Sequence, residues 1–329
     1  MTKTPRIVVL DAFTMGQDVS WELLSGQGEL VLHDRTAPGE VLARAQGAQV
    51  LFTNKTVLDA GTIDALPELK CICLLATGYN VVDVKAAAAR GIPVCNVPGY
   101  SPPAVAQHVM AVTLELFGKA CRHARAVAEG RWAAQPDFCF WDAPIVELAG
   151  KTMGVVGFGA IGSRVAELAH AFGMNVLAHV PRPKEMPPYG PFAFAGLDDL
   201  FEDSDVVSLH CPLTAESENM VNARLLARMK PTAFLVNTAR GQLVDEAALA
   251  AALGAGKLGG AALDVLREEP ARPDNPLLAA PNCLITPHVA WASVEARRRL
   301  LGIAAANLRA FLSGSPQNVV NGVGNGVGG

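Results

Sequence analysis

The sequence predicts an α/β protein with parallel sheets, divided into two domains. Short apolar runs alternate with longer, alanine-rich segments of helical character along the whole chain. The runs are apolar throughout, which predicts strands whose two faces are both covered by helices. The alternation restarts near residue 150, and 329 residues are enough for two domains of ordinary size.

Nine runs are expected to be strands, because strand–helix alternation builds βαβ units. They are residues 6–11, 50–54, 71–77, 152–159, 175–180, 205–210, 233–239, 260–266 and 283–288. Helices are expected over 102–129, where Pro102 and Pro103 suit a first turn, over 163–172 and over 292–314. The last helix is expected to return to the first domain, which would make that domain discontinuous. The low-complexity tail NGVGNGVGG (321–329) is expected to be disordered.

Composition indicates a globular protein and excludes several kinds of partner. Half of the residues are hydrophobic and 18% are charged, with a net charge of −4 and no basic block. Nucleic acid and anionic membrane surfaces are therefore not expected as partners. No apolar stretch reaches the roughly 20 residues of a membrane span. The N-terminus runs straight into a strand-like segment without a signal peptide, so a cytoplasmic location is expected.

The seven cysteines are expected to be reduced thiols, mostly in the core. Cys71 and Cys73 share one face of a predicted strand, and the odd number argues against a disulfide framework. No Cys-x2-Cys pair or histidine partner stands at ligand spacing, so no metal site is predicted.

The segment GVVGFGAIGSRVAELAHAFGM contains a dinucleotide-binding fingerprint in the required context, after a strand and before a helix. Gly157 permits the tight turn, Gly159 lets the backbone approach a pyrophosphate, and Gly162 allows close packing of helix on strand. Ala160 and Ile161 complete the cofactor loop. A glycine-rich turn without a ligand is the alternative.

The end of the following strand bears on the choice of coenzyme. An acidic residue there would bind the ribose 2′-hydroxyl of NAD, but Val180 occupies the place, with Arg182 and Lys184 after it. A neutral residue followed by basic ones predicts NADP(H), or use of both coenzymes. Arg182 as a solvated loop charge remains an alternative.

Three polar residues follow predicted strand ends, the edge at which open α/β sheets bind ligands. They are Arg240, Glu269 and His288. Reduction of a 2-keto acid needs a cation that holds the carboxylate and polarises the carbonyl, which suits Arg240. It also needs an acid that protonates the oxygen, which suits His288 oriented by Glu269. Individually, each residue could instead be structural or solvated.

The motifs GFGAIG, NTARGQLVD, DVLREEP and TPHVAWAS resemble the D-isomer-specific 2-hydroxyacid dehydrogenase family. The resemblance implies two Rossmann-like doubly wound parallel-sheet domains, with a discontinuous, flavodoxin-like substrate domain. It implies residues 1–100 plus 289–329 for the substrate domain and 101–288 for the dinucleotide domain. It also implies a homodimer, with Arg240 binding substrate, Glu269 activating the histidine and His288 as acid/base.

Further residues are assigned by the same resemblance. Ala76, Thr77 and Gly78 lie in a loop similar to the one whose N–H groups bind the substrate carboxylate. Asp264 is similar to the aspartate that contacts the nicotinamide carboxamide. Thr214, Thr238 and Ala239 are expected near the cofactor. No regulatory domain is expected after the last helix.

The segments FTNK, ATGYNVVD and DFCFWD are most similar to the glycerate dehydrogenase/hydroxypyruvate reductase branch, which implies hydroxypyruvate or glyoxylate as substrate. Trp141 is expected either to cover the active site or to pack in a dimer interface. Lys55 is a candidate substrate contact, with a solvated lysine as the alternative. A dinucleotide-sensing corepressor of the same superfamily is the rival function, and it would bind partners without turnover.

Overall fold

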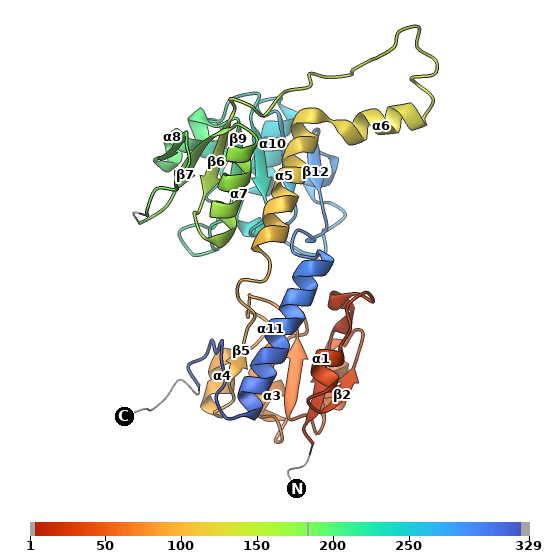
Figure 1. Ribbon diagram of the computed structural model, residues 1–329, viewed down its shortest axis with the longest axis vertical. Helices are drawn as coiled ribbons and strands as arrows, with labels where there is room; N and C mark the ends of the chain where they lie inside the picture. Colours follow the sequence, from red (N-terminus) through yellow and green to blue (C-terminus); the bar gives the residue numbers. More distant parts are fainter. Residues whose placement is uncertain (1–3, 183, 324–329) are drawn as a thin grey trace. The chain divides into compact units, whose positions relative to one another are not determined.

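The expected parallel sheets are present in the computed structural model, which describes residues 4–182 and 184–323 (Figure 1). The chain separates into a terminal unit, residues 1–101 and 292–329, and a central unit, residues 102–291. Each unit contains one parallel sheet, so the fold class predicted from the sequence is confirmed. Most of the tail expected to be disordered lies outside the described residues.

The terminal unit has a five-stranded sheet in the order β2-β1-β3-β4-β5, the order of flavodoxin-like folds. Its strands are β1 (Arg6–Val9), β2 (Glu29–Leu32), β3 (Val50–Thr53), β4 (Cys71–Leu74) and β5 (Val94–Cys95). Its helices are α1 (Glu22–Ser25), α2 (Val41–Ala45), α3 (Ala60–Asp64), α4 (Val84–Ala89) and α11 (Val294–Leu312). One face of the sheet packs with α2, α3 and α4, and α11 crosses the other face beside α1. The C-terminal helix therefore completes the unit that the N-terminus begins.

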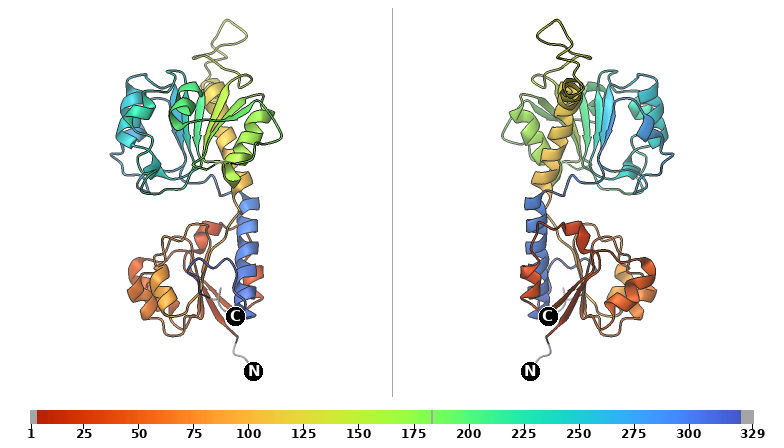
Figure 2. Two further views of the ribbon diagram at one scale, coloured as in Figure 1. Left: turned by 90° about the vertical axis from the view of Figure 1, so that its left-hand side faces the viewer. Right: turned by 90° about the vertical axis from the view of Figure 1, so that its right-hand side faces the viewer.

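The central unit has a seven-stranded sheet in the order β12-β11-β10-β9-β6-β7-β8. Its strands are β6 (Thr152–Val156), β7 (Asn175–His179), β8 (Phe192–Phe194), β9 (Val206–Leu209), β10 (Phe234–Asn237), β11 (Gly260–Leu263) and β12 (Cys283–Ile285). Its helices are α5 (Pro102–Gly118), α6 (Ala120–Ala128), α7 (Ala160–Ala171), α8 (Leu197–Asp203), α9 (Ala223–Leu226) and α10 (Glu246–Gly254). Helices α5 and α7 pack on one face of this sheet through one apolar cluster. Helices α8, α9 and α10 pack on the other face through a second cluster (Figure 2).

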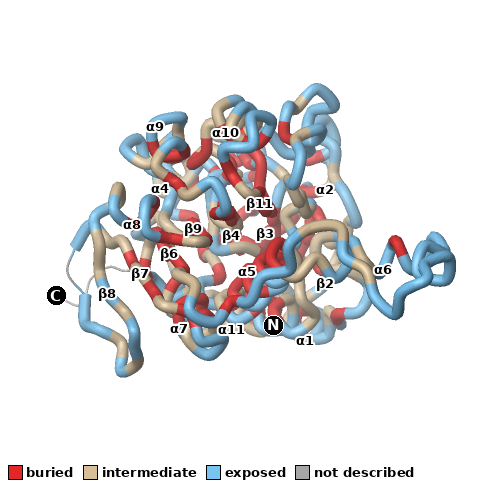
Figure 3. Tube along the Cα trace, turned by 90° about the horizontal axis from the view of Figure 1, so that it is seen from above, coloured by how far each residue is buried: buried red, intermediate tan, exposed pale blue. Residues whose placement is uncertain are grey.

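Burial follows the strands. In Figure 3 the buried residues concentrate along β3, β6 and β11, whereas α6 is mostly exposed. Side chains of the central strands are covered on both faces, which explains why their sequences are apolar throughout. Within the described residues, no helix combines the length and apolarity needed to cross a membrane.

Several boundaries differ from the sequence predictions. The expected helix over 102–129 is interrupted at Lys119, whose φ of 53° separates α5 from α6. The helix after the glycine motif begins at Ala160, not at residue 163. Strands β2, β5 and β8 were not predicted, and all three lie at an edge of their sheet. β2 and β8 are incompletely buried and β5 has only two residues, so their apolar signal is weak.

The cysteines are free thiols, but the expectation that most lie in the core is wrong. Cys71, Cys73 and Cys95 are buried, Cys211 and Cys283 are partly exposed, and Cys121 and Cys139 are exposed. The buried three meet because Cys73 and Cys95 are neighbours in register on β4 and β5, with Cys71 two residues back on the same face. Their sulfur atoms lie within 4.8 Å of one another.

Candidate active site

The three polar residues singled out in the sequence follow three adjacent strands of the central sheet. Arg240 follows β10, Glu269 follows β11 and His288 follows β12. The strands are parallel, so the loops at their carboxyl ends emerge at one edge. Adjacent strands are about 5 Å apart, which brings these loops within about 10 Å of one another.

His288 and Glu269 form a hydrogen-bonded pair. His288 Nδ1 lies 2.6 Å from Glu269 Oε2, and both side chains are about one-third exposed, at 31% and 34%. Glu269 Oε1 accepts the Leu266 N–H at 3.1 Å, which fixes the carboxylate. Because a carboxylate accepts, Nδ1 carries the proton of this bond. His288 Nε2 is therefore the ring atom available for proton exchange with a ligand.

The backbone at His288 is held in an uncommon conformation. His288 has a φ of 55°, in the left-handed region. Its N–H donates to the Asp264 carbonyl at 2.8 Å, and the Asp264 carboxylate accepts the N–H groups of Val289 and Ala290 at 2.9 and 2.8 Å. The Trp291 indole donates to the His288 carbonyl at 3.0 Å. Asp264 therefore organises the loop that presents the imidazole.

The loop that carries Arg240 is fixed by a buried asparagine and a glycine. Asn237 Nδ2 donates to the Arg240 carbonyl at 2.8 Å, and Asn237 Oδ1 accepts the Ala239 N–H at 3.0 Å. A Cβ on Gly241 would lie 1.9 Å from the Leu266 carbonyl carbon. Only glycine lets this loop approach the backbone that leads to Glu269. The Arg240 guanidinium is exposed, with Nη1 donating to the Ala239 carbonyl at 2.7 Å.

The glycine motif lies between β6 and α7, as its spacing requires. Gly157 has a φ of 95°, and a Cβ there would lie 2.7 Å from the Cys211 nitrogen. A Cβ on Gly162 would lie 2.0 Å from the Gly157 carbonyl oxygen, whereas a Cβ on Gly159 would meet no atom within 4 Å. Gly157 and Gly162 are therefore needed by the fold, and Gly159 keeps its surface open for a ligand.

The residues around this loop fit a dinucleotide. Gly159 caps the 12-residue helix α7, whose first turn, including Ala160 and Ile161, has no acidic side chain. Such a helix N-terminus binds phosphate. Past β10, the Thr238 hydroxyl is buried without a hydrogen-bond partner among the described residues, which leaves it able to bond to a polar ligand.

The remaining predicted cofactor residues also follow strands of this sheet. Ala239 is partly buried against the α10 side of the central core, and Thr214 is exposed in the turn after β9. The Thr214 N–H donates to Ser217 Oγ at 2.7 Å, which shapes that turn.

The end of β7 places basic groups beside the glycine loop. Val180 is partly buried against the α5–α7 core, and Arg182 is exposed. The Lys184 ammonium donates to the Phe158 carbonyl at 2.6 Å, within the glycine motif itself. In the described residues this strand end therefore carries positive charge and an apolar residue where an NAD site carries a carboxylate.

The loop Ala76–Thr77–Gly78 follows β4 in the terminal unit. Thr77 Oγ1 donates to the Val97 carbonyl at 2.7 Å, and Asn96 Nδ2 donates to the Thr77 carbonyl at 2.8 Å. No acceptor for the three N–H groups of this loop is found among the described residues. A rigid loop with free N–H donors is suited to an anion such as a carboxylate.

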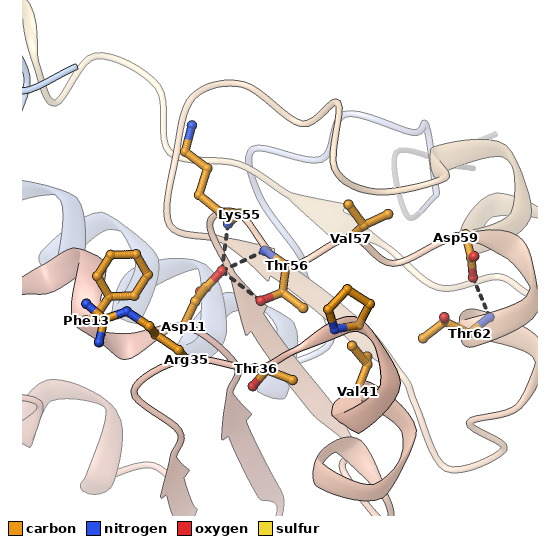
Figure 4. Close-up of a pocket in the computed structure, with 11 residues that line it drawn as sticks. Asp11, Phe13, Arg35, Thr36, Val41, Lys55, Thr56, Val57, Asp59 and Thr62 are labelled. Atoms are coloured by element: carbon orange, nitrogen blue, oxygen red, sulfur yellow. Dashed lines mark hydrogen bonds between the residues drawn. The ribbon is translucent and has the colours of Figure 1, made fainter. Parts of the chain in front are cut away.

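Lys55 follows β3 of the same sheet and lines a cavity of about 470 Å³ (Figure 4). Asp11, at the end of β1, is 2% exposed, and its Oδ2 accepts the N–H groups of Lys55 and Thr56 at 2.6 and 2.8 Å. The Lys55 ammonium points away from Asp11. The carboxylate of Asp11 thus fixes the backbone and leaves the lysine side chain exposed.

Trp141 lies in the irregular segment after α6 and is 67% exposed. Neighbouring aromatic and aliphatic side chains are exposed as well, among them Phe138 at 88%. The segment is held by the Arg131–Asp142 ion pair, at 2.5 Å, and by the Trp132 indole, which donates to the Phe138 carbonyl at 3.0 Å.

Two organising contacts were missed in the sequence. Asp11 is the last residue of the strand predicted over 6–11, where a carboxylate interrupts the apolar run. The contact between His108 of α5 and Thr286, at 3.1 Å, joins residues 178 positions apart and leaves no local pattern.

Comparison with known proteins agrees with this architecture. Residues 110–290 match the family model described as D-isomer specific 2-hydroxyacid dehydrogenase, NAD binding domain. A hydroxypyruvate reductase of Blautia hydrogenotrophica is 43% identical over 96% of this chain and 99% of its own length. A glycerate dehydrogenase of Methylorubrum extorquens is 43% identical over 86% of this chain and 88% of its own.

A solved structure shows the same fold with a cofactor bound. It is an NADPH-dependent glyoxylate/hydroxypyruvate reductase of Sinorhizobium meliloti in complex with NADP and malonate. It superposes with a TM-score of 0.81 at 32% identity, over 97% of each chain.

Fold and relatives together define an NAD(P)-dependent oxidoreductase that acts on CH–OH groups. The chain belongs to the D-isomer-specific 2-hydroxyacid dehydrogenase family.

Proposed function

We propose that the protein reduces a small 2-keto acid, hydroxypyruvate or glyoxylate, to the corresponding 2-hydroxy acid. The observation that carries this proposal is the 2.6 Å pair between His288 Nδ1 and Glu269 Oε2. The pair lies at the carboxyl edge of a dinucleotide-binding sheet, where the loop that carries Glu269 follows the strand next to the one that Arg240 follows. The names of similar proteins, a hydroxypyruvate reductase and a glyoxylate/hydroxypyruvate reductase, support the same substrates.

The roles of the three residues follow from their chemistry. The reduced nicotinamide, when bound, supplies the hydride. Arg240 binds the substrate carboxylate through its planar fork and polarises the carbonyl. His288 donates the Nε2 proton to the carbonyl oxygen as the hydride reaches carbon, and Glu269 holds the Nδ1–H and orients the ring. In the reverse direction His288 Nε2 takes the hydroxyl proton.

Two elements of the terminal unit are proposed to bind a 2-keto acid substrate. The free N–H groups of Ala76, Thr77 and Gly78 are suited to its carboxylate. The exposed Lys55 side chain, on a backbone that Asp11 fixes, is suited to a polar group on the substrate. In this division of roles the terminal unit is the substrate-binding domain, and the central unit binds the cofactor.

The first test is oxidation of NADPH and NADH with hydroxypyruvate, glyoxylate, pyruvate and 2-ketogluconate. We expect turnover on hydroxypyruvate or glyoxylate that is lost in Arg240→Ala. Absence of turnover on every keto acid, with the nucleotide still bound, would favour the rival function, a dinucleotide-sensing binding protein. Partner capture that depends on the dinucleotide would then be the next measurement.

We propose NADP(H) as the preferred coenzyme. Val180 offers no carboxylate to a ribose 2′-hydroxyl, and Lys184 holds a positive charge 2.6 Å from the Phe158 carbonyl of the glycine loop. Such a charge favours a 2′-phosphate. Arg182, two residues before Lys184, is exposed and adds a second positive charge. A kcat/KM with NADH equal to or above that with NADPH would contradict this preference.

We further propose that the protein is a homodimer. Residues 120–147 extend away from the sheet of the central unit and expose large apolar side chains: Trp132, Phe138, Trp141 and Ile145 (Figure 1). Such a cluster is suited to burial against a second copy. Sedimentation equilibrium of wild type and Phe138→Asp tests this directly. Loss of kcat/KM in Trp141→Ala with the dimer intact would instead assign Trp141 to the active site. A cytoplasmic location stays a prediction.

A further inference from the structure

The two oxygens of the Asp264 carboxylate accept different numbers of hydrogen bonds. Oδ1 accepts the Thr286 hydroxyl at 2.6 Å and the Val289 N–H at 2.9 Å, whereas Oδ2 accepts only the Ala290 N–H at 2.8 Å. Each carboxylate oxygen can accept about two hydrogen bonds. Among the described residues, Oδ2 therefore retains acceptor capacity although Asp264 is 3% exposed.

A second side chain supports this arrangement from another element. His108, on α5, places Nε2 3.1 Å from Thr286 Oγ1 and 3.8 Å from Asp264 Oδ1. The Thr286 hydroxyl has a single hydrogen, which is directed to the carboxylate at 2.6 Å. Thr286 Oγ1 therefore accepts from His108, and Nε2 carries a proton. The chain of donors runs from His108 through Thr286 to Oδ1.

We propose that Thr286 and His108 are positioning residues that aim Asp264 Oδ2 at the carboxamide N–H of the nicotinamide. The inference rests on the proposed function, and it deepens the contact expected between Asp264 and the carboxamide by naming what orients the aspartate. The Thr286 hydroxyl and the Val289 N–H saturate Oδ1, and His108 orients that hydroxyl. Thr286 and His108 thereby fix the carboxylate plane and leave Oδ2 for the ligand. A free carboxylate would rotate and bind water, which would weaken the bond to the carboxamide.

A purely structural role for the same network makes a different prediction. Asp264 also holds the loop of His288, so loss of Thr286 could simply loosen that loop. In that case binding of any dinucleotide would fall to a similar extent. A role in aiming Oδ2 affects only ligands that carry the carboxamide N–H. The two roles are separated by an analogue that lacks this donor.

The test compares the oxidised dinucleotide that the enzyme prefers with its 3-acetylpyridine analogue, in which an acetyl group replaces the carboxamide. Dissociation constants are measured by calorimetry for wild type, Thr286→Val, Thr286→Ser and Thr113→Val. Thr113 is the matched control, because it is a fully buried threonine on α5 whose hydroxyl donates to the Val109 carbonyl at 2.7 Å, outside the network.

We expect Thr286→Val to bind the carboxamide dinucleotide about tenfold more weakly, since one hydrogen bond to a charged group is lost. The acetylpyridine analogue should change less than about twofold. Thr286→Ser, which keeps the hydroxyl, should restore the preference, and Thr113→Val should keep it. His108→Gln should shift the preference in the same direction by a smaller factor, and it keeps the test available if Thr286→Val does not fold.

Two results would overturn the inference. Equal weakening of both dinucleotides in Thr286→Val would assign the network to loop structure alone. An unchanged ratio of the two affinities in Thr286→Val and His108→Gln would show that Asp264 is oriented without them. Wild-type protein that binds neither dinucleotide would instead contradict the proposed function itself, and this outcome is distinguishable from both.

Discussion

Gly162 packs so closely on Gly157 that a Cβ at residue 162 would lie 2.0 Å from the Gly157 carbonyl oxygen. This contact joins the first turn of α7 to the turn that follows β6. The neighbouring glycine of the motif, Gly159, has open space on the same side, with no atom within 4 Å of an added Cβ. Gly162 is thus required by packing, whereas Gly159 is predicted to be required by the dinucleotide, and the two requirements can be separated by experiment.

The first prediction concerns this pair. Gly162→Ala should destabilise the protein by about 3 kcal/mol or prevent folding, because a methyl group would press on backbone. Gly159→Ala should fold with an unchanged Tm, since its φ of −87° suits alanine, yet bind the dinucleotide at least about tenfold more weakly. Thermal unfolding and calorimetry measure both effects. Tight binding by Gly159→Ala would show that the pyrophosphate does not lie on this glycine.

The second prediction concerns Arg240. Its exposed guanidinium is available for a ligand, while its backbone is fixed by Asn237. Arg240→Ala should lower kcat/KM for the keto acid by about 10³-fold, and Arg240→Lys should recover only part of this loss, because an ammonium lacks the planar fork. The dissociation constant of the dinucleotide should not change. A parallel loss of dinucleotide affinity would place Arg240 in the cofactor site.

The third prediction separates orientation from proton donation at the histidine. Glu269→Gln keeps the size of the side chain but replaces the charged acceptor at 2.6 Å from His288 Nδ1 with a neutral one. We expect kcat to fall by about 10²-fold with little change in KM, because the ring loses charge stabilisation mainly as it reacts. His288→Ala should lose more activity than Glu269→Gln. Equal activity of wild type and Glu269→Gln would reduce Glu269 to a surface ion pair.

Much of the central sheet and its edge was readable from the sequence. Strands buried on both faces give uninterrupted apolar runs, so β6, β9, β10 and β11 were located within a few residues. The position of three polar residues at one edge of the sheet was predictable, because each follows such a run and parallel strands place their carboxyl ends together. These residues are Arg240, Glu269 and His288. The distance between His288 Nδ1 and Glu269 Oε2 could not be predicted from the sequence, since it depends on loop geometry.

Contacts between distant segments left no such pattern. The break at Lys119 depends on a single left-handed residue that a helical periodicity does not reveal. His108 lies on an apolar helix and reaches Thr286 only because α5 packs against β10 and β11. The buried carboxylate of Asp11 likewise fixes residues 54–56 through tertiary hydrogen bonds. The contacts of His108 and Asp11 are not predictable from the sequence, because their partners are 40 or more residues away in the chain.

The fourth prediction concerns coenzyme choice. Val180→Asp introduces a carboxylate at the end of β7, which would accept a hydrogen bond from a ribose 2′-hydroxyl and repel a 2′-phosphate. The ratio of kcat/KM for NADPH to that for NADH should fall by about 10-fold or more. Arg182→Ala should lower the same ratio by a smaller factor. If neither variant changes the ratio, the adenosine ribose is recognised elsewhere.

The last prediction follows from a second histidine, which the proposed reaction does not use. His210 follows β9, and its Nε2 lies 2.8 Å from Ser208 Oγ. Burial lowers the pKa of this imidazole from 6.5 to about 3. The folded protein therefore keeps His210 neutral, whereas the unfolded chain protonates it below pH 6.5.

The sign follows from proton uptake. Between pH 6.5 and pH 3 the unfolded state binds a proton that the folded state does not, so the free energy of unfolding falls as the pH falls. From pH 7 to pH 5 this histidine alone should cost about 2 kcal/mol. His210→Gln, whose amide reaches the position of Nε2, should be less stable at pH 7 but lose about 2 kcal/mol less than wild type over this interval. Urea unfolding at both pH values measures the difference, and identical losses in the two proteins would show that the ring is solvated enough to protonate in the folded state.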